Sequence, residues 1–298
     1  MKTLKYKIFT IIALTLLASC NQKDDDTSIQ EVNSNDITVV ELSKTNNFQG
    51  DELGIYGMEF ADLNDFTLRN KITKYRYSEG IKDYLNSYAL TKEVTDLNTF
   101  NKVAFAGLSF EKTNEMMEPQ FLKAYRAKKG VGIKEKVQEV SSAMFGKEQT
   151  FSLKTSNYEI KESQYIPELI TINNVGGSFD ESINSYRVNK NNLSVEYNTD
   201  IKNKNGVALL ILWDGTTQDM SVQELGSMNM ESKNKIVVFD PNDSGALNVP
   251  QSALSKFPKN ANITLVLMRG NAKIIDKGNK KHYLVTSSEQ YERIVLGD

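Results

Sequence analysis

The segment Asp240-Pro241-Asn242-Asp243-Ser244-Gly245 is a candidate for metal chemistry in this chain. Asp240, Asn242 and Ser244 place oxygen-bearing side chains at alternate positions before a glycine, which partly matches a calcium-binding loop. Gln251 occupies the twelfth position, where such a loop carries a bidentate Glu. Asp and Asn also accept hydrogen bonds from backbone N–H groups in turns, and glycine adopts positive φ there. We therefore predict a turn without a metal, and keep a calcium site as the weaker alternative.

The polar segment 198–206 could bind a ligand at one end of a β-domain. Asn198, Asp200 and Asn203 supply side chains that form hydrogen bonds, and the segment ends in Asn-Gly, a typical hairpin signal. The alternative interpretation is a structural turn. Asp200 would contribute to a calcium site only if the fold brings this segment beside Asp240.

Aromatic residues offer a further binding possibility. Trp213, Tyr197 and Tyr186 could form a platform on which a sugar ring stacks. However, Trp213 ends the apolar run 207–213, which favours packing in or beside a core. Trp213 is therefore a possible binding residue, with packing as the alternative.

Catalytic motifs are scarce in the sequence. His282, the one histidine, follows two lysines at the start of a strand-like run and is typical of a surface residue. No Gly-x-Ser-x-Gly elbow is present, which disfavours a histidine-dependent serine hydrolase. Two carboxylates would suffice for a glycoside hydrolase, but no pair stands out among the 38 acidic residues. We predict a protein that is not an enzyme and uses no cofactor, with a carboxylate-based glycosidase as the least favoured alternative.

Residues 1–19 resemble a removable lipoprotein signal peptide. Three lysines (Lys2, Lys5 and Lys7) precede the apolar stretch Ile8–Leu17, which is too short to span a membrane. Removal of this leader changes the formal net charge from −2 to about −5. An acidic chain with a single cysteine is typical neither of nucleic-acid-binding proteins nor of disulfide scaffolds. The sequence thus predicts an exported protein with no nucleic-acid partner.

Leu17-Ala18-Ser19-Cys20 resembles the bacterial lipobox, whose cysteine is acylated, with palmitate among the acyl groups, and becomes the first mature residue. Because Cys20 is the one cysteine, its place at a small-residue junction favours lipidation over an incidental thiol. Several acyl chains on one residue would give a stable membrane anchor. Residues 20–35 then form a polar, flexible tether. Within it, Gln22, Lys23, Asp24, Asp25 and Asp26 resemble the signal that sends lipoproteins of the Bacteroidota to the outer cell surface.

Residues 36–160 predict a mixed α+β region. The spacing of apolar residues favours helices over Ser78–Val94 and Pro119–Lys129. The runs Val103–Phe110 and Gln149–Leu153 are typical of strands. Gly132–Ala143 fits either a helix or a strand.

Residues 161–298 predict an all-β domain. Short runs rich in β-branched or aromatic residues alternate with clusters of Asn, Gly, Asp and Pro. About eight strands without β–α–β spacing favour an immunoglobulin-like sandwich. Pro250–Phe257 predicts a helical turn in a crossover, and Arg269-Gly270-Asn271 predicts a hairpin turn. The predicted strands are Tyr165–Ile172, Leu193–Tyr197, Val207–Trp213, Lys235–Phe239, Ile263–Met268, Lys273–Ile275, His282–Thr286 and Tyr291–Leu296.

Several short motifs follow one another along this domain. They are Tyr165-Ile166-Pro167-Glu168, Tyr197-Asn198-Thr199-Asp200, Asn203 through Gly206-Val207, Asp240, Asp243 and Gly245, Pro250, Pro258, and Arg269-Gly270-Asn271. Their order resembles a C-terminal β-sandwich of surface lipoproteins of the Bacteroidota, over about residues 164–296 plus the leader. Tyr197 stands where a Trp is more usual. The resemblance implies a fold and an outer-membrane location, and no activity.

Together these observations predict an outer-membrane lipoprotein, anchored through Cys20 and facing the cell exterior. The favoured function is non-catalytic binding or adhesion, with a glycan or a protein as ligand. The alternative is a structural accessory subunit of an outer-membrane complex.

Overall fold

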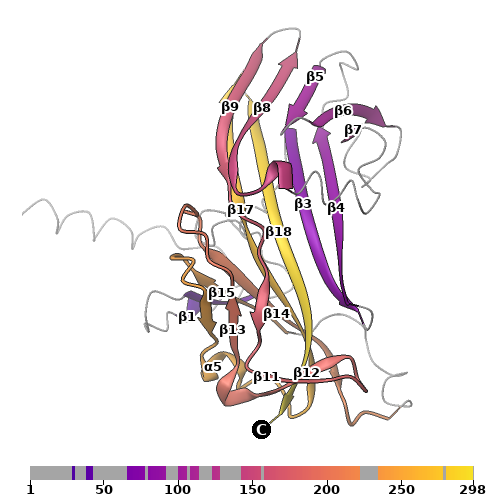
Figure 1. Cartoon of the computed structure of the whole chain (residues 1–298), viewed down its shortest axis with the longest axis vertical. Coiled ribbons are helices and arrows are strands. Elements are labelled where there is room, and N and C mark those ends of the chain that lie inside the picture. Colours follow the sequence, from indigo (N-terminus) through magenta and orange to yellow (C-terminus); the bar gives the residue numbers. More distant parts are fainter. Residues whose placement is uncertain are drawn as a thin grey trace, which may run out of the picture.

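The computed structural model of the chain describes residues 29–30, 38–42, 66–77, 80–91, 100–105, 108–113, 123–127, 142–155, 158–221, 234–277 and 280–297. Strands dominate this part of the chain. Figure 1 shows an elongated molecule in which two β-rich lobes share the long strands β17 (Ala261–Lys277) and β18 (Lys280–Gly297). Within these residues, no helix combines the length and the apolar character needed to cross a membrane.

β17 and β18 form one antiparallel hairpin that is paired along its whole length. Each strand unites two shorter strands that the sequence predicted separately. The hairpin turn predicted at 269–271 is wrong, because Arg269 pairs with Ser288 inside the ladder. The polar stretch 286–290 concealed this continuity in the sequence, yet all five residues are buried in the structure.

One lobe is a two-layer β-sandwich, which confirms the predicted sandwich. Its larger sheet has the order β1 (Ile29–Gln30), β2 (Thr38–Leu42), β15 (Asn234–Asp240), β14 (Val207–Thr217), β17, β18 and β12 (Ser185–Asn189), with β11 (Gly177–Asp180) beyond β12. Its smaller sheet has the order β10 (Ile172–Asn174), β13 (Ser194–Tyr197) and β16 (Ala246–Asn248). The strands predicted at 193–197, 207–213 and 235–239 are thereby confirmed.

The hydrophobic core of the sandwich lies between these two sheets. Leu209 and Ile211 of β14 face Val195 and other buried residues of the smaller sheet. Ala208 and Leu210 belong to a second apolar cluster on the opposite face of the larger sheet. Because both faces of β14 are buried, its sequence is apolar throughout instead of alternating.

The crossover after β16 contains α5 (Gln251–Leu254), which confirms the predicted helical turn at 250–257. Leu254 and Phe257 bury their side chains in the sandwich core. A short 3-10 helix, η1 (Lys190–Asn192), follows β12. The strand predicted at 165–172 is interrupted in the structure. Pro167 explains the break, because proline lacks the N–H group that a strand ladder requires.

The second lobe continues the larger sheet on the other side of β18. Its order is β3 (Phe66–Tyr77), β4 (Gly80–Thr91), β7 (Lys123–Ala127), β6 (Leu108–Thr113), β5 (Phe100–Phe105), β8 (Lys147–Thr155) and β9 (Glu159–Ile166). β3 runs parallel to β18. β9 returns beside β17, where Asn271 Nδ2 donates to the Tyr165 carbonyl at 2.7 Å and Lys273 Nζ lies 2.7 Å from Glu162 Oε2. The sheet therefore curls back onto the shared hairpin.

Two helices predicted in residues 36–160 are wrong. β4 occupies most of Ser78–Val94 and pairs with β3, and β7 lies within Pro119–Lys129. Tyr84, Tyr88 and Leu90 fit helical spacing, but their even separations suit one face of a strand equally well. Pairing with a distant strand decided between the two patterns, and the sequence does not show that pairing.

The other predictions in the N-terminal part fared differently. The strand predicted at 149–153 is confirmed in β8, while the run 103–110 forms two strands, β5 and β6. The ambiguous segment Gly132–Ala143 lies outside the described residues, apart from its last two positions. β1 is a short strand paired with β2 inside the stretch that the sequence predicted as a flexible tether.

Candidate functional site

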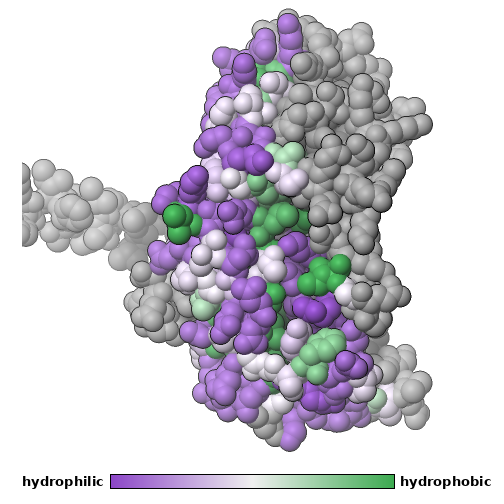
Figure 2. All heavy atoms as spheres, viewed as in Figure 1, coloured by the Kyte–Doolittle hydropathy of each residue, from purple (hydrophilic) through white to green (hydrophobic). Residues whose placement is uncertain are grey.

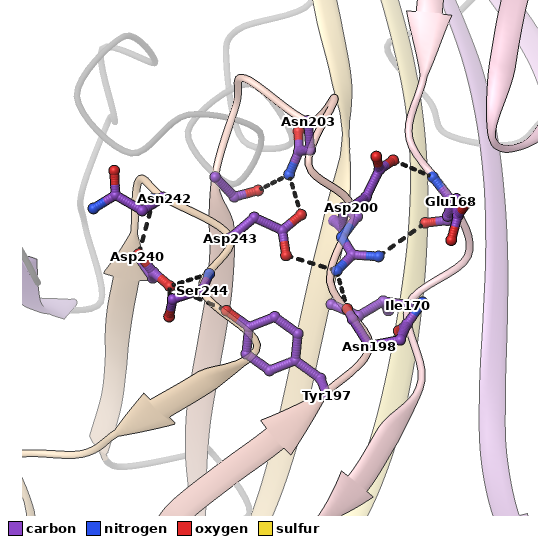
Figure 3. A network of polar contacts seen from close by, with 12 residues as sticks. Glu168, Ile170, Tyr197, Asn198, Asp200, Asn203, Asp240, Asn242, Asp243 and Ser244 are labelled. Carbon is purple, nitrogen blue, oxygen red and sulfur yellow. Dashed lines mark hydrogen bonds and ion pairs between the residues drawn. The ribbon is translucent and has the colours of Figure 1, made fainter.

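The two polar segments singled out from the sequence lie against each other in the structure (Figure 3). Residues 198–206 connect β13 to β14, and residues 241–245 connect β15 to β16. Asn203 Nδ2 donates to Asp243 Oδ2 at 2.9 Å, which joins the two connections directly. The first segment crosses between the two sheets and is not the predicted hairpin, because β13 pairs with β10 and β16 instead of β14.

Arg269 of β17 lies at the centre of this contact and is fully buried. Its Nη2 lies 2.7 Å from Asp243 Oδ1 and also donates to the Asn198 carbonyl, while its Nη1 donates to the Glu168 carbonyl at 3.3 Å. Its Nε has no hydrogen-bond partner among the described residues. The Arg269 guanidinium thus supplies a positive charge between the two connections. In the alternative prediction of a calcium site, a metal ion would have supplied this charge.

Asp240 organises the turn after β15. Its carboxylate accepts hydrogen bonds from the Asn242 amide (2.8 Å), the Ser244 amide (3.0 Å), the Ser244 hydroxyl (2.7 Å) and the Tyr197 hydroxyl (3.1 Å). Burial acts to raise the pKa of Asp240, but these donated hydrogen bonds outweigh it and hold the pKa below its ordinary value. Gly245 has φ of 88°. The predicted turn is confirmed.

Asp200 performs the same task in the first segment. It accepts hydrogen bonds from the Tyr165 hydroxyl at 2.9 Å, the Glu168 amide at 2.8 Å and the Lys202 amide at 3.0 Å. Burial raises the pKa of Tyr165 to about 12, aided by its bond to Asp200. Asp200 and Asn203 are both buried, whereas Ile201 at the tip is 87% exposed. The polar side chains of this segment therefore hold the loop in place.

The carboxylates of Asp200 and Asp240 accept hydrogen bonds from the protein, and that of Asp243 pairs with Arg269. Among the described residues, no group of three His, Cys, Asp or Glu side chains is arranged to hold a metal ion. Arg269 was not among the residues predicted at this site, because the sequence 269–271 is typical of a turn. A single Arg directly after the apolar run 263–268 was the signal available.

The three aromatic residues of the possible sugar platform have separate surroundings. Trp213 packs edge-on against Phe257 with ring centroids 6.2 Å apart, and its Nε1 donates to the Thr216 carbonyl at 2.8 Å. Tyr197 is 3% exposed and offers no face to a ligand. Tyr186 lies on β12, beside Phe179 of β11. Packing is thus the role that the structure gives Trp213.

The prediction that His282 is a surface residue is wrong, because its side chain is fully buried. It lies between β17 and β3 in the sheet, opposite Ile275 and Phe66. Its Nε2 is 3.2 Å from the Tyr158 hydroxyl. Lys280 and Lys281, which precede it, lie at the end of the β17–β18 hairpin. Their charge therefore does not mean that His282 itself is exposed.

A pocket of about 430 Å³ lies where β18 changes partners. β3 pairs with β18 as far as Tyr291, and β12 pairs with it from Ile294 onward, which leaves Glu292 and Arg293 between the two parallel partners (Figure 1). The pocket is lined by Tyr75, Arg76, Asn184, Thr264, Tyr291, Glu292 and Arg293. The pocket forms at this point because β3 ends and β12 begins along the same side of β18.

A partly buried ion pair lines this pocket, in which the Glu292 side chain is 1% exposed and the Arg76 side chain 27% exposed. Arg76 Nε lies 2.8 Å from Glu292 Oε2, and Gln290 Nε2 donates to Glu292 Oε1 at 2.7 Å. The Arg76 guanidinium also lies 5.8 Å from the Phe179 ring centroid and 5.6 Å from that of Tyr186. Both oxygens of Glu292 and the head of Arg76 are therefore held in place by the protein itself.

The remaining lining is aromatic and polar. The rings of Tyr75 and Tyr291 lie against each other, tilted by 33°, with their centroids 4.5 Å apart. Within the described part of the chain, the side chains of Arg293, Asn184 and Thr264 have no hydrogen-bond or ion-pair partner. These are the groups that the pocket offers to a ligand. No sequence signal pointed to them, because β3, β17 and β18 contribute from distant parts of the chain.

The face of the molecule shown in Figure 2 is mainly polar, with apolar residues in small separate patches. No broad apolar surface therefore stands out on this face as a candidate site. Cys20 and the predicted export signal, residues 22–26, lie outside the described residues.

Comparison with known proteins gives little further information. No family model matches the chain, and no curated protein matches it. Among solved structures, the yeast delta-COP-I mu-homology domain matches with 10% sequence identity and a TM-score of 0.25, over 78% of this chain and 96% of that one. At this TM-score the match does not establish a common fold.

Proposed function

We propose that this protein is an outer-membrane lipoprotein, anchored through Cys20 and exposed at the cell surface, whose folded part is a non-catalytic binding module. The anchor is supported by the single cysteine at a small-residue junction after an apolar leader. The acidic residues 24–26 support surface export. An acylated cysteine would hold the folded part at the membrane through the polar tether.

We also propose that the sandwich lobe is of immunoglobulin-like type, and its strand order supports this. In such domains strands C, F and G are neighbours in one sheet, while A, B and E are neighbours in the other. The larger sheet here has β14, β17 and β18 as neighbours, and the smaller sheet has β10, β13 and β16. Assigning these strands as C, F, G and A, B, E follows their order along the chain.

The observation that carries the binding function is the pocket beside Glu292 and Arg293. Its lining includes the Arg76–Glu292 ion pair, while the polar groups of three other lining residues, Asn184, Thr264 and Arg293, lack partners among the described residues. A pocket of this size is within the range that holds small ligands. Pre-organised surroundings with free polar groups favour binding, because little ordering is needed when a ligand enters.

The location is tested in cells with two variants. Cys20→Ala is expected to move the protein from the membrane fraction to the soluble fraction. The combined change of Asp24, Asp25 and Asp26 to Ala is expected to keep the anchor but protect the protein from protease added to intact cells. Membrane retention of Cys20→Ala would disprove the anchor, and unchanged protease sensitivity of the triple variant would disprove the export signal.

Binding is tested on the lipidated full chain in mild detergent. Its thermal unfolding is measured with a defined panel of monosaccharides, disaccharides, amino acids and dipeptides, since a ligand that binds only the folded state raises Tm. We expect at least one class to raise Tm, with loss of the effect in Thr264→Trp, which fills the pocket. Arg187→Gln, an exposed change on β12 outside the pocket, is the matched control.

A second candidate function, a structural subunit of an outer-membrane complex, gives a different result. No panel member would raise Tm, and the protein would co-purify with fixed partners in constant ratio from detergent-solubilised membranes. That outcome would replace the binding proposal.

A further inference from the structure

The charges of the pocket indicate which ligands it accepts. Arg76 and Glu292 neutralise each other at 2.8 Å, and Gln290 occupies the second carboxylate oxygen of Glu292. Arg293 is exposed, lines the same pocket and has no acidic partner among the described residues. The pocket therefore holds one uncompensated positive charge, which favours a ligand with one negative charge.

The neutral lining indicates the rest of the ligand. Asn184 offers a donor and an acceptor through its amide, and Thr264 offers both through its hydroxyl. Asn184 is held in a turn with φ of 49°, so its side chain is displayed from a fixed backbone position. Groups that both donate and accept match the hydroxyls of a sugar, which also donate and accept. Tyr75 and Tyr291 supply aromatic surface for C–H groups of a ring.

On this basis we infer that the pocket between β3 and β12 binds a sugar acid, that is, a sugar ring that carries a carboxylate. The carboxylate pairs with Arg293, the hydroxyls bond to Asn184 and Thr264, and the ring lies against the tyrosines. The volume of about 430 Å³ is within the range of pockets that hold small ligands. This inference rests on the proposed binding function and names its ligand class.

Cross-strand register provides a sharp test of the charge. Thr264 of β17 lies directly opposite Arg293 of β18. Thr264→Glu therefore places a carboxylate beside Arg293 from within the protein, which satisfies the cation and repels an acidic ligand. Opposite charges at directly opposed positions stabilise a sheet slightly, so this variant is expected to fold with an unchanged or raised Tm.

The experiment is isothermal titration of the lipidated full chain in mild detergent with sodium D-glucuronate, D-glucose and glutarate. We expect glucuronate to bind at least about tenfold more tightly than either other probe, because a charge-assisted hydrogen bond and the ring contacts are both needed. Arg293→Gln is expected to reduce glucuronate binding to the level of glucose, and Thr264→Glu to abolish it. Arg187→Gln is expected to bind as the unchanged protein does.

Each contrary outcome identifies what is wrong. Equal binding of glucose and glucuronate, or undiminished glucuronate binding by Arg293→Gln, would overturn the acidic class while leaving the binding function intact. If glutarate binds as tightly as glucuronate, the inference that the ligand contains a sugar ring is wrong. If none of the three probes binds but another panel compound raises Tm, the sugar-acid inference fails alone. If the whole panel also fails, the proposed binding function fails with it.

Discussion

Arg269 and Asp243 form an ion pair of 2.7 Å in which the two side chains are 0% and 1% exposed. The pair joins the shared hairpin to the turn after β15, and Asn203 ties the crossover after β13 to the same carboxylate. The shared hairpin, the turn after β15 and the crossover after β13 are thus joined through the buried Asp243 carboxylate. Such a pair is costly to bury, but it is more costly to break by removing one member.

Arg269→Met is therefore expected to lower the free energy of unfolding by about 3–5 kcal/mol, because the buried Asp243 carboxyl is left without its cation. Denaturation with urea measures the change. The double variant Arg269→Met with Asp243→Asn should lose less than the sum of the two single changes, since no unpaired charge remains. Arg187→Gln, which breaks an exposed pair with Asp180, serves as the control and should change little. A loss below about 1 kcal/mol for Arg269→Met would contradict the role of the buried pair.

Stability should fall in acid because of Asp200 and Asp240. Burial opposes ionisation of both, but hydrogen bonds donated to their carboxylates leave the pKa of each below its ordinary value. A carboxyl group of this kind binds its proton more readily in the unfolded chain, so stability is present above a pH of about 4 and is lost as pH falls below it. Burial raises the pKa of Asp243, which acts in the opposite direction.

The acid effect is measured as urea midpoints between about pH 6 and 2.5, which spans the ordinary pKa of aspartate. Asp240→Asn should be less stable at neutral pH but should lose less stability over this interval, because one of the responsible carboxyls is gone. Parallel pH curves for the variant and the unchanged protein would show that Asp240 does not contribute.

Gly206 should tolerate no side chain. Its φ is 70°, and a Cβ placed there would lie 2.4 Å from the Asp240 carbonyl oxygen. Gly206→Ala is expected to cost more than about 1 kcal/mol, through strain and displacement of the turn. Gly146→Ala is the matched control, because Gly146 has nearly the same φ, 73°, while a Cβ there would meet the flexible Glu168 side chain, at 3.2 Å, and no backbone atom within 4 Å. Equal losses of stability, measured by thermal unfolding, would show that the close contact with Asp240 is unimportant.

Phe257 should be a major support of the sandwich core. It is 1% exposed and contacts Trp213, the one tryptophan of the chain. Phe257→Ala is expected to destabilise the protein by about 3–5 kcal/mol, through lost burial and a cavity. The fluorescence of Trp213 reports the transition directly. Phe179→Ala, at a 40% exposed position, should cost far less; similar losses would contradict the assignment of Phe257 to the core.

Local patterns predicted some elements well, and for identifiable reasons. The apolar run 207–213 is buried on both faces, so its strand could be recognised without a partner. Pro250 and the apolar residues after it likewise indicated the helical turn α5. Asp240 and Gly245 indicated a turn, because the hydrogen bonds that form it are made within six residues.

Other elements depended on partners far away in the chain. Tyr84, Tyr88 and Leu90 suit a helix or a strand, and only pairing with β3 selects the strand. The polar residues 286–290 look like a break, but Ile170 and Ile172 amides donate to Ser288 and Gln290 and allow their burial. His282 and Arg269 were likewise placed wrongly, since their burial is provided by strands that the local sequence does not reveal.

By itself the sequence determined a strand-rich chain and a sandwich whose central strands are apolar on both faces. It did so because hydrophobic burial and turn chemistry act over a few residues. The tertiary structure alone decided that Arg269 lies between the connections that carry Asp200 and Asp243 and that Arg76, Thr264 and Arg293 line one pocket. In the pocket, Arg76 of β3 is nearly two hundred positions or more away from Thr264 of β17 and Arg293 of β18, and the sheet brings these strands together through register, which no local pattern encodes.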